Sequence, residues 1–450
     1  MRIRLGYILF VLGVLLDSAA LSAQGGFVSL TPSASQTVTQ PVTSSGTRST
    51  LGVNSFNNTY YVNQWCTNPG VLDDTCFSNA IADIQSHALT GYAGRRMQIL
   101  KVSPGVYTFN NTVTIPIGIN ISITGEYQAG TWGSVISAGS NPVDFFHVAA
   151  DNIEIKHLAF YGGSGIAAIT LGTTTQATFD THINWCWFLG QNAAIHIVNG
   201  GGYDLSHNTF DSGTNYGIVS NANQGDISAN DIIATDLRGY GQIQTIAIVS
   251  TSQGPNYQGY IFSGIFDHSV QNAGVIGLTG VVNATISGIF NDNNWNDVSV
   301  IGSSGVVISN FAVYNPGQTS IFVNTSNAVI ISNGLIYNAN TRFGGTPIIS
   351  ITSSGSPTVN NITTMNNGSV HSSAGLYIDS ATSASTVYGN NFGGTPGVQY
   401  DVNDSTASFN VVGSLNASKI AAGNGFTGSK TIGSCTLTIT AGIITGVSGC

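Results

Sequence analysis

Charged side chains are what this 450-residue sequence has least of. Asp, Glu, Lys and Arg make up only 7% of the residues, and 11 basic against 20 acidic side chains give a formal net charge of −9. No run of Lys or Arg offers the basic surface that nucleic acid or anionic lipid requires, so neither is expected as a partner. Hydrophobic residues still reach 42%. That share is enough to fill a core and argues against a disordered chain.

Long hydrophobic runs are also scarce. The run from Tyr7 to Leu16 follows two arginines and precedes small residues suited to cleavage. It is too short to span a bilayer comfortably, and this layout is typical of a secretory signal peptide, with an uncleaved anchor as the alternative. We therefore predict a signal peptide at 1–23, a Ser/Thr-rich leader at 24–55, and a secreted protein without a membrane span after cleavage. Removal of Arg2, Arg4 and Asp17 would change 11 minus 20 to 9 minus 19, or −10.

Cysteine is sparse, and its spacing argues against a metal site. Cys66 lies near Cys76 and Cys435 lies near Cys450, while Cys186 stands alone. Neither pair has Cys-x-x-Cys spacing and no histidine sits beside either, so zinc is not expected. In an oxidising compartment we predict the disulfides Cys66–Cys76 and Cys435–Cys450, with Cys186 as a buried small apolar side chain.

A short phrase recurs along the chain. "GVVISNFAVYN" at 305–315 is followed by "AVIISNGLIYN" at 328–338. Taking the first apolar residue of each similar phrase as a marker, the markers are Ile155, Ile183, Leu205, Ile227, Ile261, Ile286, Ile308, Ile331, Val359 and Val387. Successive markers are 28, 22, 22, 34, 25, 22, 23, 28 and 28 residues apart. A recurring step near 22 with occasional insertions indicates a solenoid.

The content of each repeat selects the kind of solenoid. Each unit has a second short run rich in Ile and Val, such as "AAIHIV" at 193–198, and Gly, Asn and Ser break the runs. These are strands separated by tight turns, which excludes a leucine-rich repeat, and a propeller blade would need about twice the period. We therefore predict an all-β fold, a parallel β-helix in which each unit is one coil.

Stacked coils would place two sets of residues in apolar columns inside the solenoid. One set is the markers, and the other lies five positions on, with members Phe160, Phe188, Phe210, Ile232, Phe266, Val313 and Ile336. Ser and Asn recur just after the markers. Because Asn tolerates turn geometry and its amide can bond to neighbouring coils, we interpret these repeats as structural.

The segment before the first coil carries a family resemblance. Residues 73–88 predict an amphipathic helix behind Asp73-Asp74-Thr75, followed by Val102-x-Pro104-Gly105-x-Tyr107 and by alternating strands up to Gly125. This order resembles the amino-terminal part of pectate-lyase-superfamily (pectin-lyase-like) proteins. The resemblance implies a right-handed parallel β-helix over 56–415, with the helix capping its open end and Asp-Asp-Thr belonging to that cap.

The tail at 416–450 predicts a small β-hairpin module that closes the other end. It contains alternating apolar residues and the cysteines Cys435 and Cys450, which would staple it.

The resemblance also implies activity on an extracellular polysaccharide, by elimination or by hydrolysis. Elimination needs a base and a cation that neutralises the sugar carboxylate. Between residues 150 and 400 the only Lys and Arg are Lys156, Arg238 and Arg342. Arg238 is therefore the candidate base or carboxylate clamp unless Ca²⁺ is recruited, and a solvated loop arginine is the alternative.

Hydrolysis needs carboxylates at set separations. Aspartates follow the third strand of neighbouring coils, so they could converge on one face, and His268, Trp295 and Tyr240 nearby would contact the sugar. These candidate catalytic aspartates are Asp211, Asp236, Asp267, Asp292 and Asp297. The Asn-Thr-Asp, Gly-His-Gly and Arg-Ile-Lys signatures of galacturonan hydrolases are missing.

A second acidic set lies just before the markers. Glu154, His182, Asp204 and Asp226 occupy equivalent outward positions in the predicted repeat. Such a stack could hold Ca²⁺, with Glu154, Asp204 and Asp226 as ligands, or could share protons. The alternative is an exposed polar face balanced by Lys156.

Two functions remain open at this point. The first is a carbohydrate-active enzyme, either a polysaccharide lyase or a glycoside hydrolase. The second is a surface protein that binds glycans without catalysis. The hydrolase interpretation requires that the aspartates lie within about 10 Å on one face.

Overall fold

The computed structural model describes residues 59–86, 97–128, 131–141, 143–162, 165, 167–251, 256–268, 274–292, 296–339, 345–365 and 374–392, together with the backbone of the strands between 400 and 448. The predicted signal peptide and leader lie outside these residues. Within them, no helix is long and apolar enough to cross a membrane.

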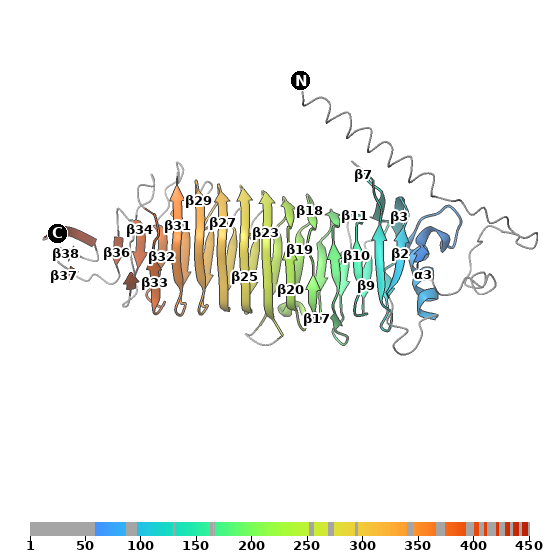
Figure 1. Ribbon diagram of the computed structural model, residues 1–450, viewed down its shortest axis with the longest axis horizontal. Helices are drawn as coiled ribbons and strands as arrows, with labels where there is room; N and C mark the ends of the chain where they lie inside the picture. The colour runs from blue at the N-terminus through green and yellow to red at the C-terminus, as the bar shows by residue number, and fades with distance from the viewer. Residues whose placement is uncertain are drawn as a thin grey trace, which may run out of the picture. The chain divides into compact units, whose positions relative to one another are not determined.

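Two long sheets run along the stacked coils (Figure 1). Sheet A contains β1 (Thr59–Tyr61), β2 (Gln98–Val102), β3 (Gly105–Phe109), β5 (Ile121–Gly125), β8 (Ser134–Ala138), β10 (Glu154–Lys156), β11 (Ala159–Tyr161), β13 (Thr178–Phe179), β14 (His182–Asn184), β15 (Trp187–Leu189), β17 (Gly200–Asp204), β18 (Thr209–Asp211), β20 (Asn230–Thr235), β21 (Arg238–Tyr240), β23 (Gln258–His268), β25 (Val282–Asp292), β27 (Ser304–Tyr314), β29 (Ile330–Tyr337), β31 (Thr358–Met365), β33 (Ser385–Tyr388) and β35 (Phe409–Val411).

Sheet B supplies the other side of each coil. It contains β4 (Val113–Ile115), β9 (Phe146–Val148), β12 (Ile169–Leu171), β16 (Ala193–Ile197), β19 (Tyr216–Asn221), β22 (Gln244–Val249), β24 (Ile276–Thr279), β26 (Val298–Ile301), β28 (Ile321–Asn324), β30 (Ile349–Thr352), β32 (Ala374–Ile378), β34 (Tyr400–Asp404), β36 (Ile420–Ala422), β37 (Gly428–Ile432), β38 (Cys435–Thr440) and β39 (Ile443–Ser448). Outside the two sheets, β6 (Tyr127–Gln128) and β7 (Thr131–Trp132) form an antiparallel pair. The 3-10 turns are η1 (Val62–Gln64) and η3 (Ala222–Gln224).

Strands of successive coils pair in parallel, and the two repeated segments at 305–315 and 328–338 lie on neighbouring coils, as predicted. β27 and β29 are neighbours, with Ile308 opposite Ile331, Ser309 opposite Ser332 and Tyr314 opposite Tyr337. The Ile side chains are fully buried. Side chains alternate between the two faces of a strand, so the same register repeats one apolar column inside the coils and polar columns outside. The predicted all-β parallel β-helix is confirmed.

Each coil bends sharply in the middle of its sheet A segment. At this bend, here called the corner, the backbone is left-handed in every described coil from residue 155 to 389. β10 and β11 lie on either side of one corner, while β23, β25 and β27 each run through theirs. Sheet A therefore has a first half before the corner and a second half after it, and these halves face different directions.

Two of the predicted markers are wrong. Ile227 and Ile261 are 43% and 47% exposed, and the buried column instead contains Ala234, Phe262 and then Ile286. Phe266 is consequently 47% exposed. The predicted inner column of phenylalanines is right from Phe160 to Phe188 to Phe210. It is then continued by Gly239, Asp267 and Asn291, not by Ile232 and Phe266.

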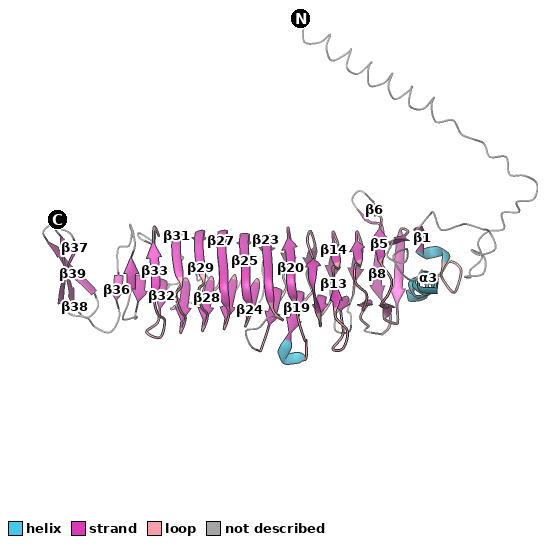
Figure 2. Ribbon diagram, turned by 60° about the horizontal axis from the view of Figure 1, so that its bottom comes forward, coloured by secondary structure: helices cyan, strands magenta, loops and turns pink. Residues whose placement is uncertain are grey.

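Helix α3 (Asp74–Ser86) lies at the amino-terminal end of the coils (Figure 2). Asp73 accepts hydrogen bonds from the backbone N (3.0 Å) and Oγ1 (2.6 Å) of Thr75, which satisfies donors at the helix start. Phe77 packs edge-on against Tyr107, Phe109 and Phe146 at centroid distances of 5.3, 5.2 and 5.6 Å. The helix therefore closes the apolar interior, and the prediction of a capping helix is confirmed.

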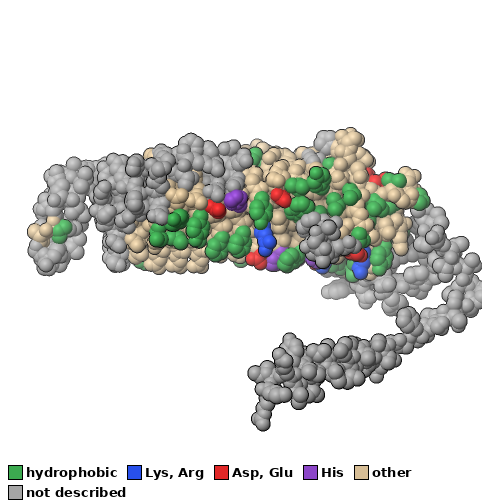
Figure 3. Space-filling model, turned by 90° about the horizontal axis from the view of Figure 1, so that it is seen from above, with side chains coloured by type: hydrophobic (Ala, Val, Ile, Leu, Met, Phe, Trp, Pro, Cys, Tyr) green, Lys and Arg blue, Asp and Glu red, His purple; other side chains and the backbone are tan. Residues whose placement is uncertain are grey.

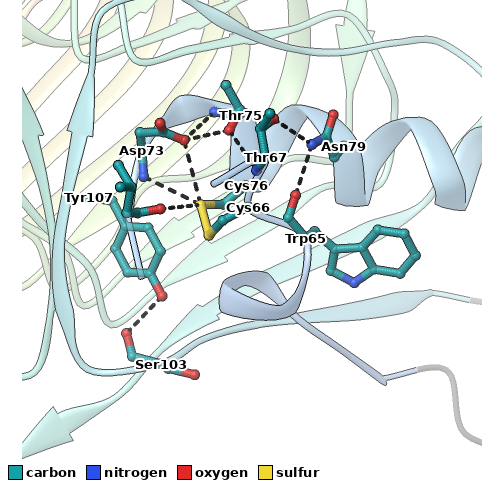
Figure 4. The surroundings of a disulfide bond; sticks show 10 residues. Trp65, Cys66, Thr67, Asp73, Thr75, Cys76, Asn79, Ser103 and Tyr107 are labelled. Atoms are coloured by element: carbon teal, nitrogen blue, oxygen red, sulfur yellow. Dashed lines mark hydrogen bonds between the residues drawn. A yellow bond between two sulfur atoms is a disulfide. The ribbon is translucent and has the colours of Figure 1, made fainter. Parts of the chain in front are cut away.

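The loop before this helix is fastened to it covalently (Figure 4). Cys66 and Cys76 form the predicted disulfide, and Asn79 donates hydrogen bonds from Nδ2 to Trp65 O (2.8 Å) and Thr67 Oγ1 (3.2 Å). Cys186 is a buried free thiol, and burial raises its pKa to about 12.

At the carboxyl end, parallel pairing continues from β34 to β36, and β36 then pairs antiparallel with β39. β37, β38 and β39 form antiparallel pairs, as expected of a hairpin module. The side chain of Cys435 and all of Cys450 lie outside the described parts of the chain, so their disulfide remains a prediction.

Candidate functional site

The second half of sheet A presents exposed aromatic rings in register on successive coils. We call eight outward side chains from β21 to β29 the aromatic face: Arg238, Tyr240, Phe266, His268, Phe290, Asp292, Tyr314 and Tyr337. Phe266 and Phe290 are both 47% exposed. Their rings stack at 5.3 Å with an interplanar angle of 11°. Tyr314 and Tyr337 make a tilted contact at 5.9 Å.

Polar groups lie beside these rings. Tyr240, His268 and Asp292 follow one another in one column. His268 Nδ1 lies 3.7 Å from Asp292 Oδ2, and Asn315 donates from Nδ2 to Asp292 Oδ1 at 2.9 Å. Figure 3 shows a face of the molecule where hydrophobic side chains lie beside acidic, histidine and basic ones. This mixture offers flat apolar surfaces together with hydrogen-bonding groups.

The predicted catalytic residues do not all reach this face. Arg238 and Asp292 belong to it, and Asp211 ends β18 on the same outer side, opposite Leu189. Asp236 lies at the corner with its side chain 60% exposed. Asp267 and Asp297 are only 4% and 0% exposed. The set therefore divides between outer surface, corner and interior, which contradicts a hydrolase built from all these carboxylates. Trp295 lies outside the described residues.

Asp267 and Asp297 belong to a buried polar cluster beneath the aromatic face. Asp267 accepts hydrogen bonds from Thr245 Oγ1 and from the His268 backbone N, the latter at 3.0 Å. Asn291 Nδ2 and Ser320 Oγ donate to Asp297 at 3.1 and 2.7 Å. Burial raises the pKa of the Asp267 carboxyl to about 7, and the charge of Asp297 adds to the rise, while the bonds from Thr245 and His268 oppose it.

The predicted calcium column is only partly assembled. Glu154, His182 and Asp204 are in register on the first half of sheet A. The next position in that column is Ile233. Asp226 instead lies against sheet B, where both carboxylate oxygens are 3.0 Å from His196 Nε2. The prediction that Asp226 shares the column is therefore wrong.

The members of this column also form ion pairs with one another or with Lys156. Lys156 Nζ lies 2.7 Å from Glu154 Oε1, and His182 Nδ1 lies 3.6 Å from Asp204 Oδ2. Desolvation alone would raise the pKa of Glu154, but hydrogen bonds from Lys156 and Ser122 and the positive charge of Lys156 hold it below its usual value. Among the described residues, no three His, Cys, Asp or Glu side chains gather as a metal site would require.

Histidine–aspartate pairs are the feature that the sequence patterns missed. On sheet B, His147 Nε2 lies 3.0 Å from Asp144 Oδ2, which also accepts from Thr170 Oγ1 at 2.9 Å. On the same sheet His196 pairs with Asp226. The partners in these pairs are 3 and 30 residues apart. The spacing of 30 residues reflects the length of one coil, so the His196–Asp226 pair could be predicted only from the correct coil register.

Comparisons with known proteins identify the fold. No protein-family model matches the chain, and no curated protein sequence matches it. Among solved structures, the mannuronan C-5 epimerase AlgE4 A-module of Azotobacter vinelandii aligns with a TM-score of 0.54 at 13% identity, covering 79% of this chain and all of that one. The PfbA surface adhesin of Streptococcus pneumoniae aligns with a TM-score of 0.52 at 11% identity, covering 86% and 98%.

A third solved structure has the same architecture. The DFA-IIIase of Arthrobacter chlorophenolicus A6 aligns with a TM-score of 0.51 at 14% identity, covering 75% of this chain and 95% of that one. Together with the coil register, these likenesses establish a pectin-lyase-like right-handed parallel β-helix. At such low identity they show the fold alone, so the function has to be argued from the site.

Proposed function

We propose that this protein binds an extracellular polysaccharide along the aromatic face. The observation that carries the proposal is the stacked pair Phe266 and Phe290, each half exposed beside Arg238 and His268. Contiguous exposed rings on neighbouring coils form an apolar patch, and such patches mark interaction sites on protein surfaces. A sugar ring packs its C–H face on such a ring while its hydroxyls bond to nearby polar groups.

Two further observations support this function. The fold is shared with a mannuronan C-5 epimerase module and with a surface adhesin, and the first of these acts on a polysaccharide. The predicted signal peptide and the Cys66–Cys76 disulfide favour secretion, because disulfides persist in oxidising compartments.

The test replaces both rings, Phe266→Ala with Phe290→Ala, and measures retention in gels that contain neutral or acidic polysaccharides. Removing two stacking contacts of about 0.7 kcal/mol each should weaken binding about tenfold. Phe179→Ala is the control, because Phe179 is 48% exposed but lies in β13, outside the aromatic face. If the native protein is retained by some glycan and the double variant is retained equally, the aromatic face is not the binding surface.

Cleavage of the bound glycan, by hydrolysis or elimination, is the second candidate function. It is favoured by His268, which sits on the aromatic face with Asp292 beside its Nδ1, since a carboxylate can orient an imidazole for proton transfer. The assay follows unsaturated products and reducing ends with and without Ca²⁺. Product formation that is lost in His268→Asn would support catalysis, whereas binding without any product would leave recognition as the function.

A further inference from the structure

The type of residue at the corner of sheet A differs between the first and the later coils. Among the described residues, ten coils have a left-handed residue there, and six of these residues are Gly or Asn, the types that tolerate this backbone best. The four that are neither lie in consecutive coils. In chain order, the corner residues are His157, Trp185, His207, Asp236, Gly264, Gly288, Asn310, Asn333, Asn361 and Gly389.

A bulky ring at positive φ is unusual, and such strain costs of order 1–3 kcal/mol. Trp185 has φ 57° and remains 54% exposed. Its large ring is therefore held in a disfavoured backbone conformation without being buried in the core. Three other described coils have asparagine at the same corner position, so the coil geometry does not require a tryptophan at residue 185.

Trp185 is part of a ladder that crosses three coils. Its ring stacks on His207 at a centroid distance of 4.2 Å and an angle of 11°. His207 Nδ1 in turn lies 3.2 Å from Asp236 Oδ2. In the next coil a Cβ at Gly264 would lie 2.6 Å from Asp236 Oδ1, so glycine leaves room for this carboxylate. We call Trp185, His207 and Asp236 the corner ladder.

The corner ladder adjoins the aromatic face. Arg238 follows Asp236 by two residues and is paired in register with Phe266, so hydrogen-bonding groups run from the corner to the stacked phenylalanines. On the other side of the corner, Asn184 and His182 end the first half of the coil. An exposed indole, followed one and two coils further by imidazole, carboxylate and guanidinium groups, can hold neighbouring units of a glycan, one by packing on the indole and the next by hydroxyl hydrogen bonds.

We propose that the corner ladder is a second glycan-contact site, in which one sugar unit packs against the exposed part of the Trp185 indole and a neighbouring unit of the same chain, beyond His207, forms hydroxyl hydrogen bonds with Asp236 and Arg238. This inference rests on the proposed function, because it takes the same polysaccharide as the ligand. It extends the binding surface around the corner, across the coils that contain residues 185–238. The strained backbone at Trp185 is then the cost of presenting an indole where the fold itself would accept asparagine.

The experiment uses the full chain and the polysaccharide that the native protein binds most tightly in the gel panel. Trp185→Asn installs the residue that other coils use at the corner, and we expect an unchanged or higher melting temperature with at least fivefold weaker binding. Asp236→Asn keeps a corner-compatible residue while removing the carboxylate, and we expect weaker binding at an unchanged melting temperature. Phe179→Ala is the matched aromatic control.

The outcomes separate this inference from the proposed function. Weaker binding by both corner variants with intact melting temperatures supports the corner ladder as a contact site. Native-like binding by Trp185→Asn and Asp236→Asn overturns it while leaving the aromatic face in place, and a lower melting temperature with native-like binding assigns the ladder a structural role instead. If no polysaccharide retains the native protein, both proposals fail together.

Discussion

Asp267 shows how one buried carboxyl group can shape the stability of a coil. It occupies an inner position in the column where Phe160, Phe188 and Phe210 stack in preceding coils. A Cβ at Gly239 would lie 2.5 Å from either carboxylate oxygen, so the neighbouring glycine makes space for it. Removal of a charged carboxylate from water is costly, and the group responds by keeping its proton to higher pH.

This gives a pH-dependent contribution with a definite sign. The pKa of Asp267 is about 7 in the folded protein against an ordinary value of 3.8. Between about pH 4 and 7 the folded state therefore holds a proton that the unfolded state has released, and this contribution to stability falls as pH rises, by at most about 1.4 kcal/mol per pH unit. Asp267→Asn has no carboxyl group to ionise, so it should not lose this stability. We therefore expect the melting temperature of the variant, relative to that of the native protein, to rise between pH 5 and pH 8.

The measurement is thermal unfolding of both proteins across that pH range. Asp211→Asn changes a carboxylate at the outer surface in the same way, and it should leave the slope of melting temperature against pH close to native. A native slope in Asp267→Asn as well would show that this carboxyl group is already ionised in the folded protein.

At the scale of single coils, the markers in β23 and β25 decide which site predictions are right. The marker Ile286 in β25 is a true inner residue, so the side chain six residues after it points outward, and this side chain is Asp292 at the surface. At Ile261 the true inner residue is the next one, Phe262, and this one-residue slip exchanges the two faces of the strand. Asp267 was therefore predicted outward and Phe266 inward, and both predictions are wrong. The step of 34 residues is itself a product of the two wrong markers, because the buried residues Leu205, Ala234 and Phe262 are 29 and 28 residues apart.

The capping helix offers a prediction at the scale of an element. Phe77 is fully buried against three aromatic rings of the first coils. Phe77→Ala should cost about 3–5 kcal/mol locally, because a large core side chain is lost and a cavity remains. In a solenoid each coil contacts mainly its neighbours, so hydrogen exchange should accelerate in β3, β4 and β9 and remain native in β27 and β29.

Hydrogen exchange followed by mass spectrometry resolves these segments. Phe179→Ala, at an exposed phenylalanine, should leave the exchange of β3, β4 and β9 unchanged. Uniform acceleration along all coils in Phe77→Ala would contradict nearest-neighbour stability and would indicate a single cooperative unit.

For the whole molecule, the regular parts were predictable and the site only in part: Arg238, Tyr240, His268 and Asp292 were candidates from the sequence, whereas the stacked Phe266 and Phe290 were not. Repeat spacing, the helix at 73–88 and the paired cysteines gave the architecture, because periodic apolar residues and turn residues determine it locally. The corner ladder and the pairs His196–Asp226 and His268–Asp292 join residues of different coils, so predicting them requires the correct coil register. The same holds for the buried cluster around Asp267 and Asp297.

The charge of the whole chain bears on which polysaccharide it binds. The formal net charge is −9, and among the described outward positions of β18, β21, β23, β25, β27 and β29 after the corner, Arg238 is the only Lys or Arg. A polyuronate would meet repulsion with little compensation, so we expect a neutral glycan as the tighter ligand. Affinity for a neutral glycan should change less than about twofold between 50 and 500 mM NaCl, since its contacts carry no net charge to screen. Titration calorimetry with a neutral and an acidic glycan at both salt concentrations measures this, and tighter binding of the acidic glycan with a tenfold loss at high salt would contradict the expectation.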